Sequence, residues 1–225
     1  YQPPYFRLME RLNLGGANAA PRVMRPKHLG LDDLGESGAD HLVDVRESLA
    51  YAAGHMQGAV CLPVGMIPAF AGWFISEGDT IALIASEEDE LAQAMAHLVR
   101  IGLDNIVGGY VGVIPAAAQG KAMQSIAMID TEEVARRLAE DSEDWTLLDV
   151  RALDERQQGS IDESEHVYVG ELNTRWKELD RDRHYTLMCA SGMRASVAAG
   201  WLASQGFKHL DVYLGSMGAW TNAQG

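Results

Sequence analysis

Residues 185–194 read YTLMCASGMR. The first four are an apolar run typical of a buried strand, and residues 195–204 have a helical pattern. Cys189 therefore stands on a loop between the end of a strand and the start of a helix. Backbone N–H groups in such a loop form a concave anion site, and the positive end of the helix adds to that field. The sequence thus favours a thiolate nucleophile at Cys189, with Arg194 able to hold an oxyanion by two hydrogen bonds.

The chain also contains an internal repeat. Three pairs of segments correspond in sequence: 41–46 with 146–151, 54–56 with 159–161 and, after a one-residue slip, 100–103 with 204–207. The shift of about 105 positions is too long for a solenoid repeat and indicates two copies of one domain.

In the second copy, short apolar runs alternate with segments of helical periodicity. The predicted strands are 146–150, 167–169, 185–188 and 210–213, and the predicted helices are 131–140, 171–178 and 195–204. Asp130 offers an N-cap for the first of these helices. This alternation predicts an α/β fold in which each copy is a small parallel sheet with helices on both faces. Sites in open parallel sheets lie beyond the carboxyl ends of the strands, where Cys189 stands.

The chain divides into four segments. Residues 1–20, with Pro3-Pro4 and Gly15-Gly16, are predicted to be a tail or connector. The remaining segments are the first domain, a linker rich in small and polar residues, and the second domain: 21–117, 118–127 and 128–225.

Composition limits the function classes. The formal net charge is −14, from 32 acidic and 18 basic residues, and it repels nucleic acids and anionic membranes. No apolar run approaches the roughly 18 residues that span a bilayer. The first residues resemble no signal peptide, and the lack of an initial Met suggests a fragment or a trimmed chain.

The cysteines point to a reducing, cytoplasmic setting, and the histidines argue against a metal site. The two cysteines, Cys61 and Cys189, fall in different predicted domains, so we expect free thiols rather than a disulfide. The seven His residues are scattered without the spacing of metal ligands, so we expect no metal and no cofactor.

These features together resemble the rhodanese family, as two tandem copies over about 200 residues. The resemblance is carried by four sets of residues: Asp-Val-Arg at 44–46 and 149–151, Gly-His-Met-Gln-Gly-Ala at 54–59, Cys-Ala-Ser-Gly-Met-Arg at 189–194, and Gly-Ser-Met-Gly-Ala-Trp at 215–220.

The resemblance implies sulfur transfer in the second domain. Cys189 would take a sulfane sulfur from thiosulfate or a persulfide and pass it to a thiol or to cyanide. A persulfide on this sulfur would be cradled by the backbone of Ala190, Ser191, Gly192, Met193 and Arg194, and Arg194 would orient the donor. The expected partners are therefore a small-molecule donor and acceptor, with no nucleic acid and no membrane.

Two alternatives remain open. Phosphatase and arsenate-reductase relatives of the family use a loop one residue longer than the one between Cys189 and Arg194, so the shorter loop favours sulfur. A non-catalytic binding or regulatory module would instead need an unreactive Cys189.

The first copy departs from the pattern at the loop. Ala85 stands where Cys189 stands, and Glu90 where Arg194 stands, within the acidic run 87–90. Carboxylates there repel a thiolate or thiosulfate, so we predict that the first copy is catalytically inert. The simplest interpretation of the acidic run is a solvated helix start, where carboxylates favour the helix dipole.

The remaining candidates have structural interpretations. Asp149 and Arg151 are expected near the site, chiefly tying the strand end to its neighbouring loop, as Asp44 and Arg46 would in the first copy. Cys61 lies in an apolar run and is expected in the core. Trp220 is expected to serve packing. The second copy also has Asp-Glu-Ser at 162–164 where the first has Gln-Gly-Ala, which leaves donor preference open.

Residues 5–13, YFRLMERLN, are similar to the connector that follows a metallo-β-lactamase-fold persulfide dioxygenase in fusion proteins with rhodanese domains. This short match is only a hint about the parent protein, and it leaves open whether a hydrolase domain lies upstream. The metal-binding His/Asp motifs of such a hydrolase are absent from the sequence, so no dioxygenase activity is expected here.

Overall fold

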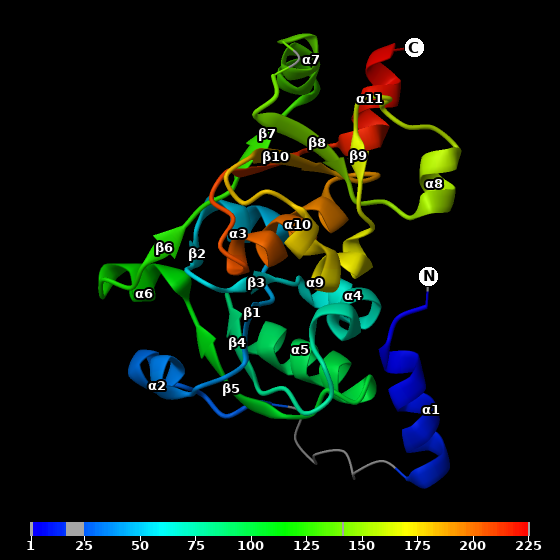
Figure 1. The fold of residues 1–225 in the computed structure, drawn as a ribbon. Coiled ribbons are helices and arrows are strands. Elements are labelled where there is room, and N and C mark those ends of the chain that lie inside the picture. Colours follow the sequence, from blue (N-terminus) through cyan, green and yellow to red (C-terminus); the bar gives the residue numbers. More distant parts are fainter. Residues whose placement is uncertain (1, 17–24, 141, 225) are drawn as a thin grey trace. The chain divides into compact units, whose positions relative to one another are not determined.

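The computed structural model describes residues 2–16, 25–140 and 142–224. The chain divides into two compact units, Tyr1–Gln124 and Ser125–Gly225 (Figure 1). Each unit carries its own parallel sheet, as the sequence predicts.

The sheet of the N-terminal unit has the strand order β3-β1-β4-β5, and all its pairs are parallel. Its strands are β1 (His41–Asp44), β3 (Val60–Cys61), β4 (Ile81–Ala85) and β5 (Ile106–Val111). Every residue of β4 is buried, because this apolar strand is central in the sheet and covered on both faces. Two short strands, β2 (His55–Met56) and β6 (Met123–Gln124), form a separate antiparallel pair.

Helices lie on both sides of this sheet. They are α1 (Tyr5–Gly15), α2 (Leu31–Glu36), α3 (Ser48–Ala53), the 3-10 helix η1 (Val64–Met66), α4 (Ile67–Phe74), α5 (Glu88–Arg100) and α6 (Val113–Ala118). Helix α2 packs on β5, and α5 packs on β4 and β5 from the opposite side (Figure 1). Across the described residues, no helix of the chain combines the length and apolar composition that crossing a bilayer requires.

Part of the segment predicted to be a tail forms helix α1, which packs on its own unit. The Tyr5 hydroxyl donates to the Pro68 carbonyl at 2.8 Å, and Leu8 is buried. A Cβ on Gly72 would lie 2.4 Å from the Tyr5 ring, so the missing side chain makes room for the helix. Tyr5, Leu8 and Leu12 recur at helical spacing, which is the physical reason that this segment folds.

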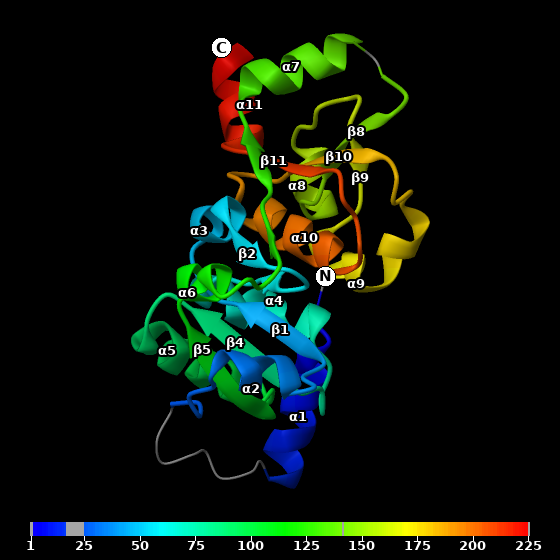
Figure 2. The same cartoon turned by 90° about the vertical axis from the view of Figure 1, so that its left-hand side faces the viewer.

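The sheet of the C-terminal unit has the order β7-β11-β10-β8-β9, again with parallel pairs. Its strands are β7 (Ala127–Ile129), β8 (Trp145–Asp149), β9 (Glu165–His166), β10 (His184–Met188) and β11 (Leu210–Tyr213). Helices α7 (Thr131–Glu140) and α11 (Ser216–Gln224) lie together on one side. The other side carries α10 (Met193–Ser204) and α9 (Leu172–Arg175) (Figures 1 and 2).

Most predicted elements of this unit are confirmed. The predicted helix 131–140 matches α7, and its predicted cap is present, because the Glu133 amide donates to Asp130 Oδ1 at 3.0 Å. The predicted strand 167–169 is wrong, since pairing with β8 uses Glu165 and His166 instead. The predicted helix 171–178 is three short turns: η2 (Val169–Glu171), α9 and η3 (Trp176–Glu178).

The repeat is confirmed in atomic detail at the ends of α5 and α10. Gly102 has φ +82° and Gly206 has φ +93°, a conformation that favours glycine. The amide of the next residue reaches back in both copies. Leu103 donates to the Leu98 carbonyl at 3.0 Å, and Phe207 donates to the Leu202 carbonyl at 3.2 Å.

Candidate active site

Cys189 lies at the carboxyl end of β10, between the ends of β8 and β11, where the sequence predicts the site. Only 1% of its surface is exposed. The chain then turns through Gly192, at φ +108°, into the N-terminus of α10. The Gly192 amide donates to Cys189 Sγ at 3.1 Å, so the sulfur faces a loop N–H group at the positive end of a helix. This environment stabilises negative charge on the sulfur.

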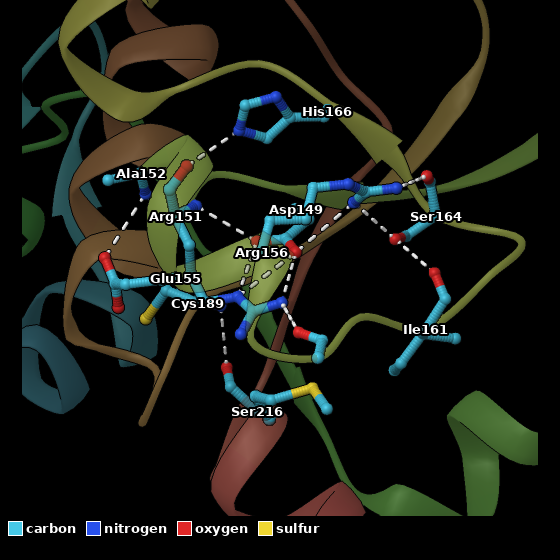
Figure 3. Close-up of polar contacts among 12 residues, drawn as sticks. Asp149, Arg151, Ala152, Glu155, Arg156, Ile161, Ser164, His166, Cys189 and Ser216 are labelled. Atoms are coloured by element: carbon cyan, nitrogen blue, oxygen red, sulfur yellow. Dashed lines mark hydrogen bonds and ion pairs between the residues drawn. The ribbon is translucent and has the colours of Figure 1, made fainter.

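Ser216, at the start of α11, supports the Cys189 loop by a hydrogen bond. This role was not predicted from the sequence. The Cys189 amide donates to Ser216 Oγ at 3.1 Å (Figure 3). That hydroxyl donates in turn to the Tyr213 carbonyl at 2.8 Å. Ser216 is fully buried at φ +50°, unusual for a residue other than glycine. The sequence signal for this unusual turn is that Ser216 lies between Gly215 and a second glycine two residues later.

Two backbone hydrogen bonds complete this support. The Met217 amide donates to the Cys189 carbonyl and the Gly218 amide donates to the Ala190 carbonyl, both at 3.0 Å. A Cβ on Gly218 would lie 3.3 Å from that second carbonyl, so glycine permits the close approach. The loop carbonyls are therefore held toward α11, and the loop conformation is fixed.

Asp149 and Arg151 form a buried pair that ties down the turn after β8 (Figure 3). Arg151 donates to both Asp149 oxygens, at 2.7 Å from Nη2 to Oδ2, and to the Gly159 carbonyl at 2.8 Å. The same geometry recurs in the N-terminal unit, where Arg46 pairs with Asp44. Because the copy without the cysteine keeps the pair, its contacts support the structural interpretation.

The segment 162–164, where the second copy differs in sequence from the first, belongs to an ordered hydrogen-bond network. Arg156 donates to Ser164 Oγ and to the Ser164 carbonyl, each at 2.7 Å, and to Asp149 Oδ2 at 3.3 Å (Figure 3). Ser164 in turn donates to the Ile161 carbonyl at 2.6 Å. In the first copy, Tyr51 makes the matching contact, donating from its hydroxyl to the Ala59 carbonyl at 2.7 Å.

Arg194, the residue expected to orient the donor, makes a two-pronged ion pair with Glu155. Its Nη1 donates to Oε2, and its Nη2 donates to Oε1 at 2.7 Å. This contact raises the pKa of Arg194 further, and attraction to Cys189 adds to the rise, while burial opposes it. The same contact lowers the pKa of Glu155. Sequence reasoning missed Glu155 because its partner lies far along the chain.

The corresponding loop of the N-terminal unit holds no thiol. Ala85 is buried at the end of β4, and its carbonyl accepts the Gly112 amide at 3.0 Å, as the Cys189 carbonyl accepts that of Met217. Glu90 accepts the amide of Ser86 in this loop at 2.7 Å. The other two carboxylates in the first turn of α5 lie near exposed basic side chains, with Glu88 3.3 Å from His28 and Asp89 3.7 Å from Arg25.

The other candidates pack as expected. Cys61 is fully buried in β3, and burial strongly raises the pKa of its thiol, so it stays protonated. Both cysteines are free. Trp220 packs against a buried cluster that includes Met188 and Tyr213. In the described part of the chain, no three His, Cys, Asp or Glu side chains come together in a way that could hold a metal ion.

Comparison with known proteins identifies the family. The sequence model of the Rhodanese-like domain matches twice, at residues 30–115 and 130–223. The protein YtwF of Bacillus subtilis is 35% identical over 95 residues, which is 42% of this chain and 90% of the relative. A protein of Allochromatium vinosum named sulfurtransferase is 34% identical over 92 residues, or 41% of this chain and 85% of its own length.

Among solved structures, a rhodanese-related protein from Thermoplasma volcanium is 29% identical. It covers 43% of this chain and 91% of its own, with a TM-score of 0.39. The two family matches fall one in each structural unit and together span most of the sequence. The chain therefore belongs to the rhodanese-like domain family, of which it carries two tandem copies.

Proposed function

We propose that the C-terminal unit is a sulfurtransferase that moves a sulfane sulfur from thiosulfate or a persulfide to a thiol or to cyanide. The observation that carries this proposal is the contact of the Gly192 amide with Cys189 Sγ at the N-terminus of α10. A sulfur held there is a stabilised nucleophile, and a persulfide formed on it places its terminal charge among the same N–H groups.

The first half-reaction loads the enzyme. The Cys189 thiolate attacks the outer sulfur of the donor and forms a new S–S bond. The bond between that sulfur and the rest of the donor breaks, and its electron pair leaves with sulfite or with a thiolate. No oxidant or reductant is needed, because the sulfane sulfur moves with its oxidation level unchanged.

The second half-reaction unloads it. A thiolate or cyanide attacks the terminal sulfur of the Cys189 persulfide, and the electron pair of the S–S bond returns to Cys189. Because only 1% of Cys189 is exposed, donor and acceptor must each reach into the loop end-on. This constraint favours small, terminal sulfur groups over bulky ones.

The N-terminal unit takes no part in the proposed chemistry. Its loop has Ala85 at the nucleophile position and Glu90 facing the loop amide of Ser86. We infer that its function is structural or concerned with a partner. The expected setting of the whole reaction is the cytoplasm, where thiols stay reduced.

The assay that tests the proposal follows thiocyanate formation from cyanide with thiosulfate or glutathione persulfide as donor. Cys189→Ser should abolish transfer from both donors. Cys61→Ser should keep nearly full activity, because its thiol is buried and protonated. Transfer that survives in Cys189→Ser, or that disappears in a folded Cys61→Ser protein, would overturn the assignment of the nucleophile.

A further inference from the structure

Comparison of the two copies of the domain separates ion pairs that belong to the fold from those that occur in one copy. The pair of Asp149 with Arg151 recurs in the first copy as Asp44 with Arg46, with matching contacts. The pair of Glu155 with Arg194 does not recur. At the repeat positions the first copy has Ala50 and Glu90, so the copy that lacks the cysteine also lacks both partners. The second pair therefore accompanies the nucleophile rather than the fold.

Glu155 is itself held in place. The Ala152 amide donates to Glu155 Oε2 at 3.2 Å, which fixes the carboxylate in the first turn of α8 (Leu153–Gln157). From there it meets the Nη1–Nη2 edge of Arg194, the edge that would otherwise face an incoming oxyanion. The side chains of Arg194 and Glu155 are 19% and 35% exposed, so the pair is partly shielded from solvent.

We propose that Glu155 is a positioning residue that sets donor specificity: it fixes Arg194 beside the Cys189 loop and cancels its charge. This inference rests on the proposed function and deepens it. Thiosulfate brings two negative charges to the site, whereas a low-molecular-weight persulfide brings at most one on its reacting sulfur. With Arg194 already matched by a carboxylate, the site discriminates against the dianion and favours persulfide donors.

The kinetic test compares the two donors in Glu155→Gln. Removing the carboxylate frees Arg194 for the sulfonate group of thiosulfate. We expect the ratio of kcat/KM for thiosulfate to kcat/KM for glutathione persulfide to rise about tenfold, mainly through a lower KM for thiosulfate. Glu155→Asp, which keeps the charge, should restore much of the original ratio. An unchanged ratio, or an equal loss for both donors, would overturn the proposal.

Glu178→Gln is the matched control. It removes the same charge and also takes a carboxylate from an arginine, because Glu178 accepts from Arg175 at 2.9 and 3.0 Å. Its donor ratio should equal that of the wild type. A similar rise in this variant would show that the effect follows net charge rather than the pair with Arg194.

A binding measurement separates this inference from the proposed activity. In the Cys189→Ser background no transfer occurs, so calorimetry reports thiosulfate binding alone. Adding Glu155→Gln should tighten that binding about tenfold, with a steeper dependence on salt. Equal affinity with and without Glu155 would reject its role even if the enzyme transfers sulfur. Tighter binding here, combined with no persulfide on a chain that keeps Cys189, would instead reject the proposed function and keep the electrostatic role.

Discussion

At the scale of single residues, the site depends on four groups that come from three separate segments of the chain. The thiol of Cys189, the hydroxyl of Ser216, the carboxylate of Glu155 and the guanidinium of Arg194 meet through contacts that span 27 and 39 positions. Ser216 and Glu155 are each held by a second contact, so neither depends on a single hydrogen bond. Pre-organisation of this kind is what lets a loop stabilise a charged sulfur without rearranging.

Ser216→Ala tests the support behind the nucleophile. The change leaves the buried Cys189 amide without its acceptor, so we expect a loss of about 1–3 kcal/mol in the free energy of unfolding. We also expect kcat to fall about tenfold as the loop loosens. Urea unfolding and steady-state kinetics measure the two effects.

Ser216→Gly separates the hydroxyl from the backbone strain at the same position. Glycine relieves the cost of φ +50° but also removes the hydroxyl. This variant should recover part of the stability and little of the activity. Full activity in either variant would contradict the role of the hydroxyl in holding the loop.

At the scale of elements, the start of α10 decides the geometry around the sulfur. Gly192 occupies φ +108°, which L-residues with a side chain rarely adopt, and its amide is the one that meets Cys189 Sγ. Gly206, just beyond the other end of α10, has φ +93° and open space around its missing Cβ.

The two glycines therefore form a matched pair for mutation. Gly192→Ala and Gly206→Ala should each cost about 1–2 kcal/mol of stability from backbone strain. Only Gly192→Ala should also abolish most sulfur transfer, because it displaces the amide from the sulfur. If Gly206→Ala lost activity to the same extent, the loss would reflect helix stability rather than loop geometry.

A buried histidine in strand β2, packed against helix α3, makes the stability of the N-terminal unit depend on pH. His55 is fully buried and stacks on Tyr51 at 3.8 Å between ring centroids, and its Nε2 has no hydrogen-bond partner among the described residues. Burial lowers the pKa of His55 from its usual 6.5, while the hydrogen bond to the Tyr51 carbonyl opposes that shift.

The unfolded chain therefore binds a proton at His55 at a higher pH than the folded chain does. Stability from this residue is complete above about pH 6.5 and falls as the pH drops from there toward the lowered folded-state pKa. Urea unfolding of the N-terminal unit at pH 7.5 and pH 5.5 checks this. His55→Phe keeps the ring stack and should reduce the difference between the two pH values; an undiminished difference would assign it to other groups.

The elements also show what the sequence could predict. Strand β10, helix α7 and strand β11 follow from strong local patterns, and the Asp-Val-Arg pairs are local contacts two residues apart. The sequence pattern predicts a strand at 167–169 rather than at β9, because the two residues of β9, one of them charged, show no strand signal. The turns between 169 and 178 are each too short to show helical periodicity.

The candidate site could be predicted only where its residues lie close together in the sequence. The nucleophile and its loop are contiguous in sequence, so local sequence alone was enough to name Cys189 and Gly192. The glycines around Ser216 mark an unusual turn, but the partners of Ser216 and Glu155 are set by the folded topology, which brings α11 and α8 to the carboxyl edge of the sheet. No local pattern encodes contacts across 27 or 39 positions.

At the scale of the whole molecule, one fold occurs twice with different chemistry. Both units keep the buried Asp–Arg pair and the glycine turn that follows the long helix. Among the described residues, only the C-terminal unit combines a thiol, a loop amide on the sulfur and a matched Arg–Glu pair. We therefore assign all sulfur transfer to one unit and one atom, the Sγ of Cys189.

The most direct test of that claim is the intact mass of the full chain after incubation with thiosulfate or glutathione persulfide, for the wild type and Cys189→Ser. We predict a gain of about 32 Da, one sulfur, in the wild type and none in Cys189→Ser. No gain with either donor, or the same gain in Cys189→Ser, would contradict the assignment.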